Sequence, residues 1–224
     1  MCSLFSFRSS PEKARNLFNY REHPNFTPRE HVHPTQPIAI VRASLDRTPE
    51  FALVRWGLVP SWAKEILPGR PLINARSETV YKKASFKNAV RRRRCLIPAD
   101  GFYEWQDVGA PKKQAWFIHK PDHSLFAFGG IWEHWTGPDG SELESAAMLT
   151  TASTPLLAAL DDRSPVVIAP HDFTRWLSVE EKVADLFQSP ADGFWTTEKI
   201  PSPRARIKTA EPKTPPPKSQ KDLL

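Results

Sequence analysis

The sequence predicts a β-rich α+β protein whose sheets are mostly antiparallel. Short apolar segments rich in Val, Ile, Phe and Trp, each bounded by turn residues, dominate residues 37–170, and this pattern is typical of strands. The intervals between them are too short for the helical crossovers that parallel strands require. No repeat of solenoid or propeller length occurs, so we expect one globular domain.

The expected elements follow in chain order. Strands are predicted over 37–42, 51–60, 94–105, 114–120, 124–135, 146–153 and 164–170. Helices are predicted over 10–21, 81–94, 169–178 and 178–190. Ser10 precedes Pro11, which is a favourable start for the first of these helices.

Composition narrows the classes of protein. The 224 residues are 40% hydrophobic and 25% charged with a net charge of +6, which fits a soluble globular protein. No apolar run is long enough to span a bilayer, and the start lacks a signal peptide. The two cysteines form no CxxC pair or disulfide framework, which favours a reducing, cytoplasmic location.

The domain is expected to cover residues 1–198. Residues 199–224 are rich in Pro and Lys and almost free of large apolar side chains, so we expect a disordered tail. Its basic residues suit either simple solvation or loose contact with nucleic acid.

Two polar or aromatic motifs occur in the first half of the chain. "WGLVPSW" runs from Trp56 to Trp62 and is either a core strand ending in a turn or a platform on which a base stacks. In "INARSE", Asn74, Arg76 and Glu78 share one face if the chain is extended. Because these groups are costly to bury unpaired, that face belongs at a solvated edge or in a polar cleft.

The third motif is "RRRRCLIPADGFYEW". The run Arg91–Arg94 suits the C-terminal end of a helix or contact with phosphates. Glu104 lies among Phe102, Tyr103 and Trp105, and apolar surroundings raise the pKa of a carboxyl group. Glu104 is therefore a candidate general acid–base group; the alternative is an outward-facing residue on an alternating strand.

The fourth motif is "LDDRSPVVI". Asp161, Asp162 and Arg163 form either a turn with a local ion pair or a charged site at the mouth of a strand. His31 and His33 offer half a metal site, but no Cys, Asp or Glu cluster completes it. We therefore expect no metal.

Together with the "MC" start, "WGLVPSWAK", "INARSETV", "RRCLIPADGFYEW" and "DRSPVVI" occur in the order seen in the SOS response-associated peptidase (SRAP) family of abasic-site processing proteins. The chain resembles this family over about residues 2–180. The resemblance implies a barrel-like core of antiparallel sheets with peripheral helices. It implies binding of single-stranded DNA that contains abasic sites, also at junctions with double-stranded DNA, and no cofactor. We expect a monomer that binds no membrane.

The resemblance gives Cys2 a chemical role. An abasic site exposes an aldehyde when its sugar opens, and an amine condenses with an aldehyde to a Schiff base. Once Met1 is removed, Cys2 carries an α-amine, whose pKa of about 7.7–8.0 keeps far more of it neutral than the about 10.4 of lysine. Its thiol can then close on the imine carbon, giving a thiazolidine crosslink that shields the lesion.

The resemblance implies further site residues. Asn74 orients Cys2 or the sugar through hydrogen bonds, and Glu104 manages protons during Schiff-base formation. The expected DNA contacts are Arg76 and Arg163 to phosphates, and Trp56, Pro60 and Trp62 in a wedge and stacking region.

The chain departs from the family pattern at two places. The usual "MCGR" start has Ser3 and Leu4 in place of Gly and Arg. Asp161 stands where the family has the histidine that assists ring opening and reversal of the crosslink. An aspartic acid donates a proton near neutral pH only if its pKa rises well above about 3.9. We predict that crosslinking survives with an altered rate or reversal.

Three other activities fit the motifs. A Schiff base can lead to β-elimination, giving abasic-site lyase activity. A thiol peptidase or autopeptidase would use Cys2 on peptide bonds, including its own bond to Met1. A single-stranded DNA-binding module with impaired catalysis would follow from the loss of the histidine.

Overall fold

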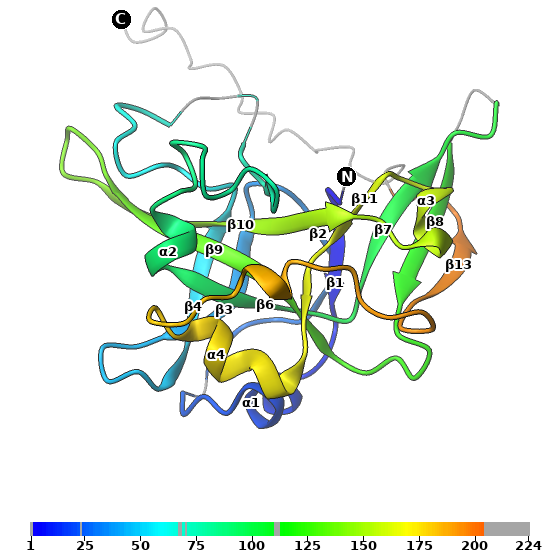
Figure 1. Ribbon diagram of the computed structural model, residues 1–224, viewed down its shortest axis with the longest axis horizontal. Helices are drawn as coiled ribbons and strands as arrows, with labels where there is room; N and C mark the ends of the chain where they lie inside the picture. The colour runs from blue at the N-terminus through cyan, green and yellow to red at the C-terminus, as the bar shows by residue number, and fades with distance from the viewer. Residues whose placement is uncertain (1, 23, 67–68, 70, 110–112, 204–224) are drawn as a thin grey trace, which may run out of the picture.

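Two β-sheets form the protein, shown in Figure 1 as a computed structural model that describes every residue except 1, 23, 67–68, 70, 110–112 and 204–224. The first sheet has the order β13 (Thr196–Ile200), β8 (Gln114–His119), β7 (Gly101–Gln106), β1 (Phe5–Phe7) and β2 (Arg29–Val32). The second has the order β11 (Arg163–Pro165), β10 (Glu142–Ala152), β4 (Pro49–Trp56), β3 (Pro37–Ala43), β6 (Arg94–Ala99), β9 (Phe126–Thr136) and β12 (Val167–Ile168), with β5 (Asn74–Arg76) beside β10.

The second sheet closes on itself. Strand β10 pairs with β4 on one side and with β9 on the other, so β10, β4, β3, β6 and β9 form a ring. All strand pairs of this sheet are antiparallel except β10 with β4 and β10 with β5. The predicted β-rich class and barrel-like core are confirmed.

Aromatic side chains join the two sheets in the core. The ring of Phe5 on β1 meets Trp56 of β4 at 5.1 Å and Phe128 of β9 at 6.1 Å between centroids, both edge to face. Phe102 of β7 meets Phe128 in the same way at 5.9 Å. Such pairs contribute beyond the area that they bury, so they fix the first strand against the barrel.

Helix α1 (Pro11–Phe18) confirms the first predicted helix. The Ser10 hydroxyl accepts a hydrogen bond from the Lys13 N–H at 3.2 Å, and Asn19 ends the helix in the left-handed conformation with φ 55°. The predicted helix at 169–178 is a 3-10 turn, η1 (Pro170–Asp172), followed by α4 (Phe173–Leu177). A short helix that was not predicted, α3 (Pro155–Ala158), precedes β11.

Two predicted helices are largely absent. Within 81–94 only α2 (Ala89–Arg92) is helical, and successive turns precede it. Within 178–190 there is one 3-10 turn, η2 (Ala184–Leu186). Arg94 donates to the carbonyls of Ser178 and Glu181, and Arg175 donates to the Lys182 carbonyl, so side chains from outside this segment hold it in another path. Tertiary contacts therefore override the local helix preference.

The chain's last described strand passes the expected domain boundary. Strand β13 pairs with β8 through Ile200, two residues beyond position 198. The rest of the predicted tail, from residue 204, lies outside the described residues. Among the described residues no helix is long and apolar enough to cross a membrane.

Candidate functional site

Cys2 lies in the protein interior at the start of the chain. Its side chain is 1% exposed, and its thiol donates to the Leu4 carbonyl at 3.6 Å. Burial raises the pKa of this thiol, and the negative charges of Glu104 and Asp161 add to the shift, while the bond to Leu4 opposes it. The thiol is therefore protonated at neutral pH.

Strand β1 holds the segment that carries Cys2. The Tyr103 N–H donates to the Leu4 carbonyl at 3.0 Å, and Phe5 pairs with Phe102 of β7. This pairing brings the first residues beside "GFYEW", about a hundred positions along the chain.

Asp100 fastens the other end of the same segment. Its carboxylate accepts from the N–H of Arg8 at 2.5 Å, from the N–H of Ser9 at 2.8 Å and from the Ser9 hydroxyl at 2.6 Å. The sequence shows Asp100 only as part of a "PADG" turn. Its partners lie more than 90 residues away, so local patterns carry no signal for this positioning role.

Asn74 contacts Cys2 directly. Its Nδ2 donates to the Cys2 carbonyl at 2.7 Å. Strand β5 places it there by running parallel to β10, where Asn74 pairs with Met148. The buried Oδ1 of Asn74 has no hydrogen-bond partner among the described residues, so this oxygen can accept a bond from a ligand.

Glu104 lies inside the protein on β7. It is 6% exposed, which rules out the outward-facing alternative. Its charge raises the pKa of the Cys2 thiol, so the two side chains lie in the same part of the interior.

Asp161 is the third side chain of this region, since its charge also raises the pKa of the Cys2 thiol. Burial pushes the pKa of its carboxyl group up, but the charged amino terminus of the unprocessed chain and the Arg163 N–H, which donates at 2.9 Å, outweigh burial and lower the pKa. Asp161 is thus a carboxylate at neutral pH that can accept a proton. The raised pKa that proton donation requires is absent.

The two predicted phosphate-binding arginines differ in their surroundings. Arg76 at the end of β5 is exposed. Arg163 donates to both carboxylate oxygens of Glu78, at 2.5 and 2.9 Å, and to the Thr150 carbonyl at 2.6 Å. These hydrogen bonds lower the pKa of Glu78. Glu78 therefore holds Arg163 in place within the protein.

The residues of the predicted stacking region differ in their exposure to solvent. Trp56 is fully buried, and its Nε1 donates to the Ile73 carbonyl at 3.1 Å. The ring is therefore part of the core, whereas the resemblance implied a contact with DNA at this residue. Pro60 is half-buried, whereas Trp62 is 61% exposed and its Nε1 lies 3.4 Å from the Ala84 carbonyl. Trp62 alone keeps an open aromatic face.

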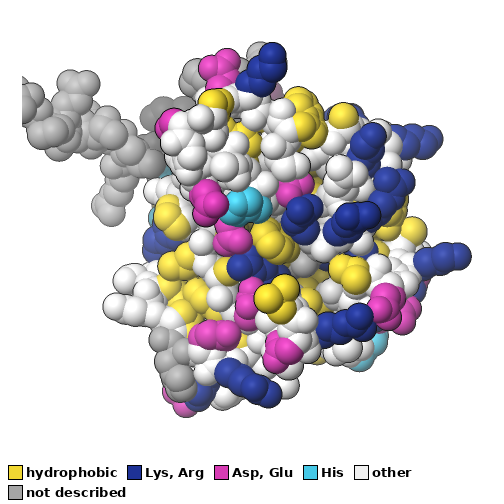
Figure 2. Space-filling view, turned by 90° about the vertical axis from the view of Figure 1, so that its left-hand side faces the viewer, with side chains coloured by type: hydrophobic (Ala, Val, Ile, Leu, Met, Phe, Trp, Pro, Cys, Tyr) yellow, Lys and Arg dark blue, Asp and Glu magenta, His cyan; other side chains and the backbone are white. Residues whose placement is uncertain are grey.

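The run Arg91–Arg94 contains both exposed arginines and arginines engaged in contacts within the protein. Arg94 is buried and donates to the Trp176 carbonyl at 2.6 Å, and Arg93 pairs with Glu133 at 3.1 Å. Arg91 and Arg92 are exposed and line a hollow of about 770 Å³ beside α2. Figure 2 shows Lys and Arg side chains gathered toward the right of one face of the molecule. The hollow is separate from Cys2, so it is not the candidate reaction centre.

Comparisons with known proteins agree with these motifs. A family model described as SOS response associated peptidase (SRAP) matches residues 1–200. The chain is 33% identical over 194 residues to the abasic site processing protein YoqW of Bacillus subtilis, covering 84% of this chain and 85% of that protein. It is 28% identical over 204 residues to the abasic site processing protein HMCES of Rattus norvegicus, covering 75% of this chain and 58% of that protein.

A solved structure supports the fold. A protein from Bacteroides thetaiotaomicron superposes with a TM-score of 0.80 at 22% identity, covering 89% of this chain and 92% of that one. With the family model spanning both sheets and all four motifs, the chain belongs to the SOS response associated peptidase (SRAP) family.

Proposed function

We propose that this protein captures abasic sites in single-stranded DNA as a covalent thiazolidine at Cys2, after removal of Met1. The observation that carries the proposal is the setting of Cys2, whose carbonyl is held by Asn74 while its thiol feels the charges of Glu104 and Asp161. The printed names of the relatives, abasic site processing proteins, support DNA with abasic sites as the substrate.

The amine reacts first. The lone pair of the Cys2 α-amine attacks the aldehyde carbon, giving a carbinolamine, and loss of its hydroxyl with a proton releases water and leaves an iminium ion. A nearby carboxylate such as Glu104 takes protons from the amine and returns one to the departing hydroxyl, which is ordinary general acid–base work. The positive iminium is stabilised by the neighbouring carboxylates.

The thiol reacts second. Because burial keeps it protonated, it is a weak nucleophile until the electrophilic iminium lies beside it. Sulfur then bonds to the iminium carbon and its proton passes to a carboxylate. The balanced outcome is one thiazolidine and one water from amine, thiol and aldehyde.

Asp161 should affect the formation and the reversal of the crosslink differently. Its carboxylate is ionised at neutral pH and can take up the thiol proton as sulfur bonds to the iminium carbon. Reversal requires a proton to be returned to the ring, and an acid of low pKa holds few protons at neutral pH. We therefore expect slow reversal and a long-lived crosslink that shields the lesion.

Two exposed residues are suited to hold the DNA. Arg76 supplies a cation next to Asn74, and Trp62 offers a face on which a base can stack. Both interactions tolerate any sequence. Binding at a junction between single- and double-stranded DNA would need further phosphate contacts, which exposed basic residues such as Arg91 and Arg92 could supply.

The test is a denaturing gel after incubation with a single-stranded oligonucleotide that carries one abasic site. Intact mass first verifies that Met1 is absent. A covalent band that is lost in Cys2→Ala supports the proposal, and no band from the processed wild type overturns it. Strand cleavage without a stable band indicates a lyase, and equal non-covalent binding by wild type and Cys2→Ala indicates a binding module. Cleavage of unrelated proteins indicates a peptidase.

A further inference from the structure

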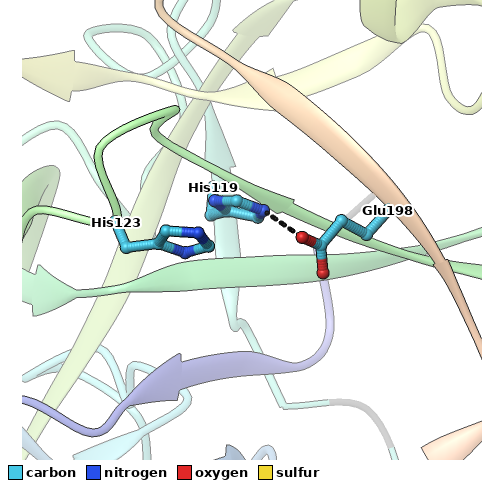
Figure 3. Close-up of side chains that lie close together, drawn as sticks. All are labelled: His119, His123 and Glu198. Atoms are coloured by element: carbon cyan, nitrogen blue, oxygen red, sulfur yellow. Dashed lines mark ion pairs between the residues drawn. The ribbon is translucent and has the colours of Figure 1, made fainter.

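Three potential metal ligands meet at the edge of the first sheet. His119 ends β8, His123 lies in the turn that follows, and Glu198 lies on β13. One ligand atom of each lies within 4.8 Å of the others. Figure 3 shows the His119 ring between the other two side chains, with the Glu198 carboxylate directed at it.

The hydrogen-bonding of His119 leaves the lone pair of its neutral ring on Nε2. Its side chain is 2% exposed, and its Nδ1 lies 2.7 Å from the Lys120 carbonyl. A carbonyl only accepts, so Nδ1 carries the hydrogen and the neutral ring has its lone pair on Nε2. A backbone carbonyl on the far nitrogen is the arrangement that orients histidine ligands toward metals.

The lone pair faces another acceptor. The buried Nε2 has no hydrogen-bond partner among the described residues, and Glu198 Oε1 lies 3.3 Å away. Two lone pairs at this distance repel unless a positive charge lies between them, which is either a proton on Nε2, giving the ion pair drawn in Figure 3, or a metal ion. Ligands about 2.0–2.1 Å from a tetrahedral zinc ion are about 3.3–3.4 Å apart, which matches the separation of these two atoms.

His123 completes the set after a side-chain rotation. Its ring stacks on His119 at 4.2 Å between centroids with 14° between planes, and parallel rings cannot both direct a lone pair at one ion. The residue is exposed on a turn with φ 52°, so its ring is free to turn toward the ion.

We propose that His119, His123 and Glu198 bind a divalent transition ion, with zinc the best match to two imidazoles and one carboxylate. Water would take the fourth position. Within the described part of the chain, β13 pairs with β8 alone, and the ion would hold this strand to the sheet. The site is independent of crosslinking by Cys2.

The test is calorimetric titration of the chelator-treated full-length protein with Zn²⁺, together with thermal unfolding. We expect one ion per chain and a higher melting temperature with Zn²⁺, since a ligand that binds the folded state stabilises it. His123→Ala and Glu198→Gln change exposed side chains and should each weaken binding about tenfold or more, at least as much as loss of an outer-shell partner.

His31→Ala combined with His33→Ala is the matched control and should bind Zn²⁺ like the wild type. The absence of saturable binding overturns the proposal. Wild-type affinity in both His123→Ala and Glu198→Gln also overturns it. Loss of binding in Cys2→Ala overturns it by placing the ion at the thiol, and a thiolate charge-transfer band with Co²⁺ would report the same outcome. Crosslinking is measured separately, so either proposal can fail alone.

Discussion

The side-chain amide of Asn74 donates to the backbone carbonyl of Cys2 at 2.7 Å. This bond ties Cys2 to β5, which in turn pairs with β10 of the closed ring. Residues near a chain terminus are otherwise prone to fray. The bond therefore limits the positions that the backbone of Cys2 can adopt, which the proposed chemistry at its nitrogen requires.

Asn74→Ala should slow crosslinking while leaving the fold intact. Loss of a hydrogen bond is worth about 0.5–1.5 kcal/mol, and loss of orientation adds to it, so we expect a decrease of about tenfold in rate. Time courses on denaturing gels measure it. Asn88→Ala is the matched control, because Asn88 makes no side-chain capping bond. Equal rates for both variants would contradict the positioning role.

Asp161→His should speed reversal of the crosslink. An imidazole with a pKa near 6.5 holds protons near neutral pH, whereas the Asp161 carboxyl, with a lowered pKa, does not. Reversal by the variant should therefore fall as pH rises through about 6.5, and the wild type should lack that step. Release of DNA from the purified crosslink, chased with excess abasic oligonucleotide between pH 5 and 8, measures this.

Asp161→Asn separates charge from shape in the same assay. It keeps the size of the side chain and removes both proton acceptance and negative charge. We expect slower crosslinking than in the wild type and no acceleration of reversal. Faster reversal in Asp161→Asn would show that removal of the negative charge, rather than proton donation by histidine, controls that step.

Glu78→Gln should strengthen binding to single-stranded DNA. It removes the charge that engages Arg163 and makes the guanidinium available to phosphates. One added phosphate contact steepens the salt dependence by about 0.7 in log–log slope for single strands. Fluorescence anisotropy over a salt series measures it, with Glu12→Gln on α1 as control. An unchanged slope would mean that Arg163 stays a structural residue.

Trp56→Ala and Trp62→Ala should separate stability from DNA binding. Trp56 is fully buried, so its removal should cost about 3–5 kcal/mol of unfolding free energy. Trp62 is exposed, so its removal should change stability by about 0.5 kcal/mol or less and weaken DNA binding by about 1–3 kcal/mol. Urea unfolding and anisotropy measure the two effects. Unchanged affinity in Trp62→Ala would remove it from the interface.

The strands were predictable because their signal is local. Alternating or continuous apolar runs between turn residues set most of β3, β4 and β6–β10, and Ser10 before Pro11 set the start of α1. The helix expected at 178–190 did not form, and this segment is instead held by contacts from Arg94 of β6 to the carbonyls of Ser178 and Glu181. Nothing near residue 180 in the sequence indicates those contacts.

The candidate site shows the same limit. Cys2, Asn74, Glu104 and Asp161 were identifiable from motifs, and the structure brings them together. The burial of Trp56 and the engagement of Arg163 by Glu78 depend on packing between distant segments. The third potential ligand beside His119 and His123 is Glu198, 75 or more positions along the chain, so sequence spacing could not reveal this cluster.

Burial of the Cys2 thiol has a consequence for the lifetime of the protein. If Cys2 forms the proposed crosslink, the residue is consumed by the reaction, so each molecule would act once. Oxidants attack the thiolate in preference to the thiol, and burial suppresses the thiolate. Burial of the Cys2 thiol should therefore also slow its oxidation by peroxides. Molecules that have not yet reacted should keep a reduced Cys2 through oxidative stress.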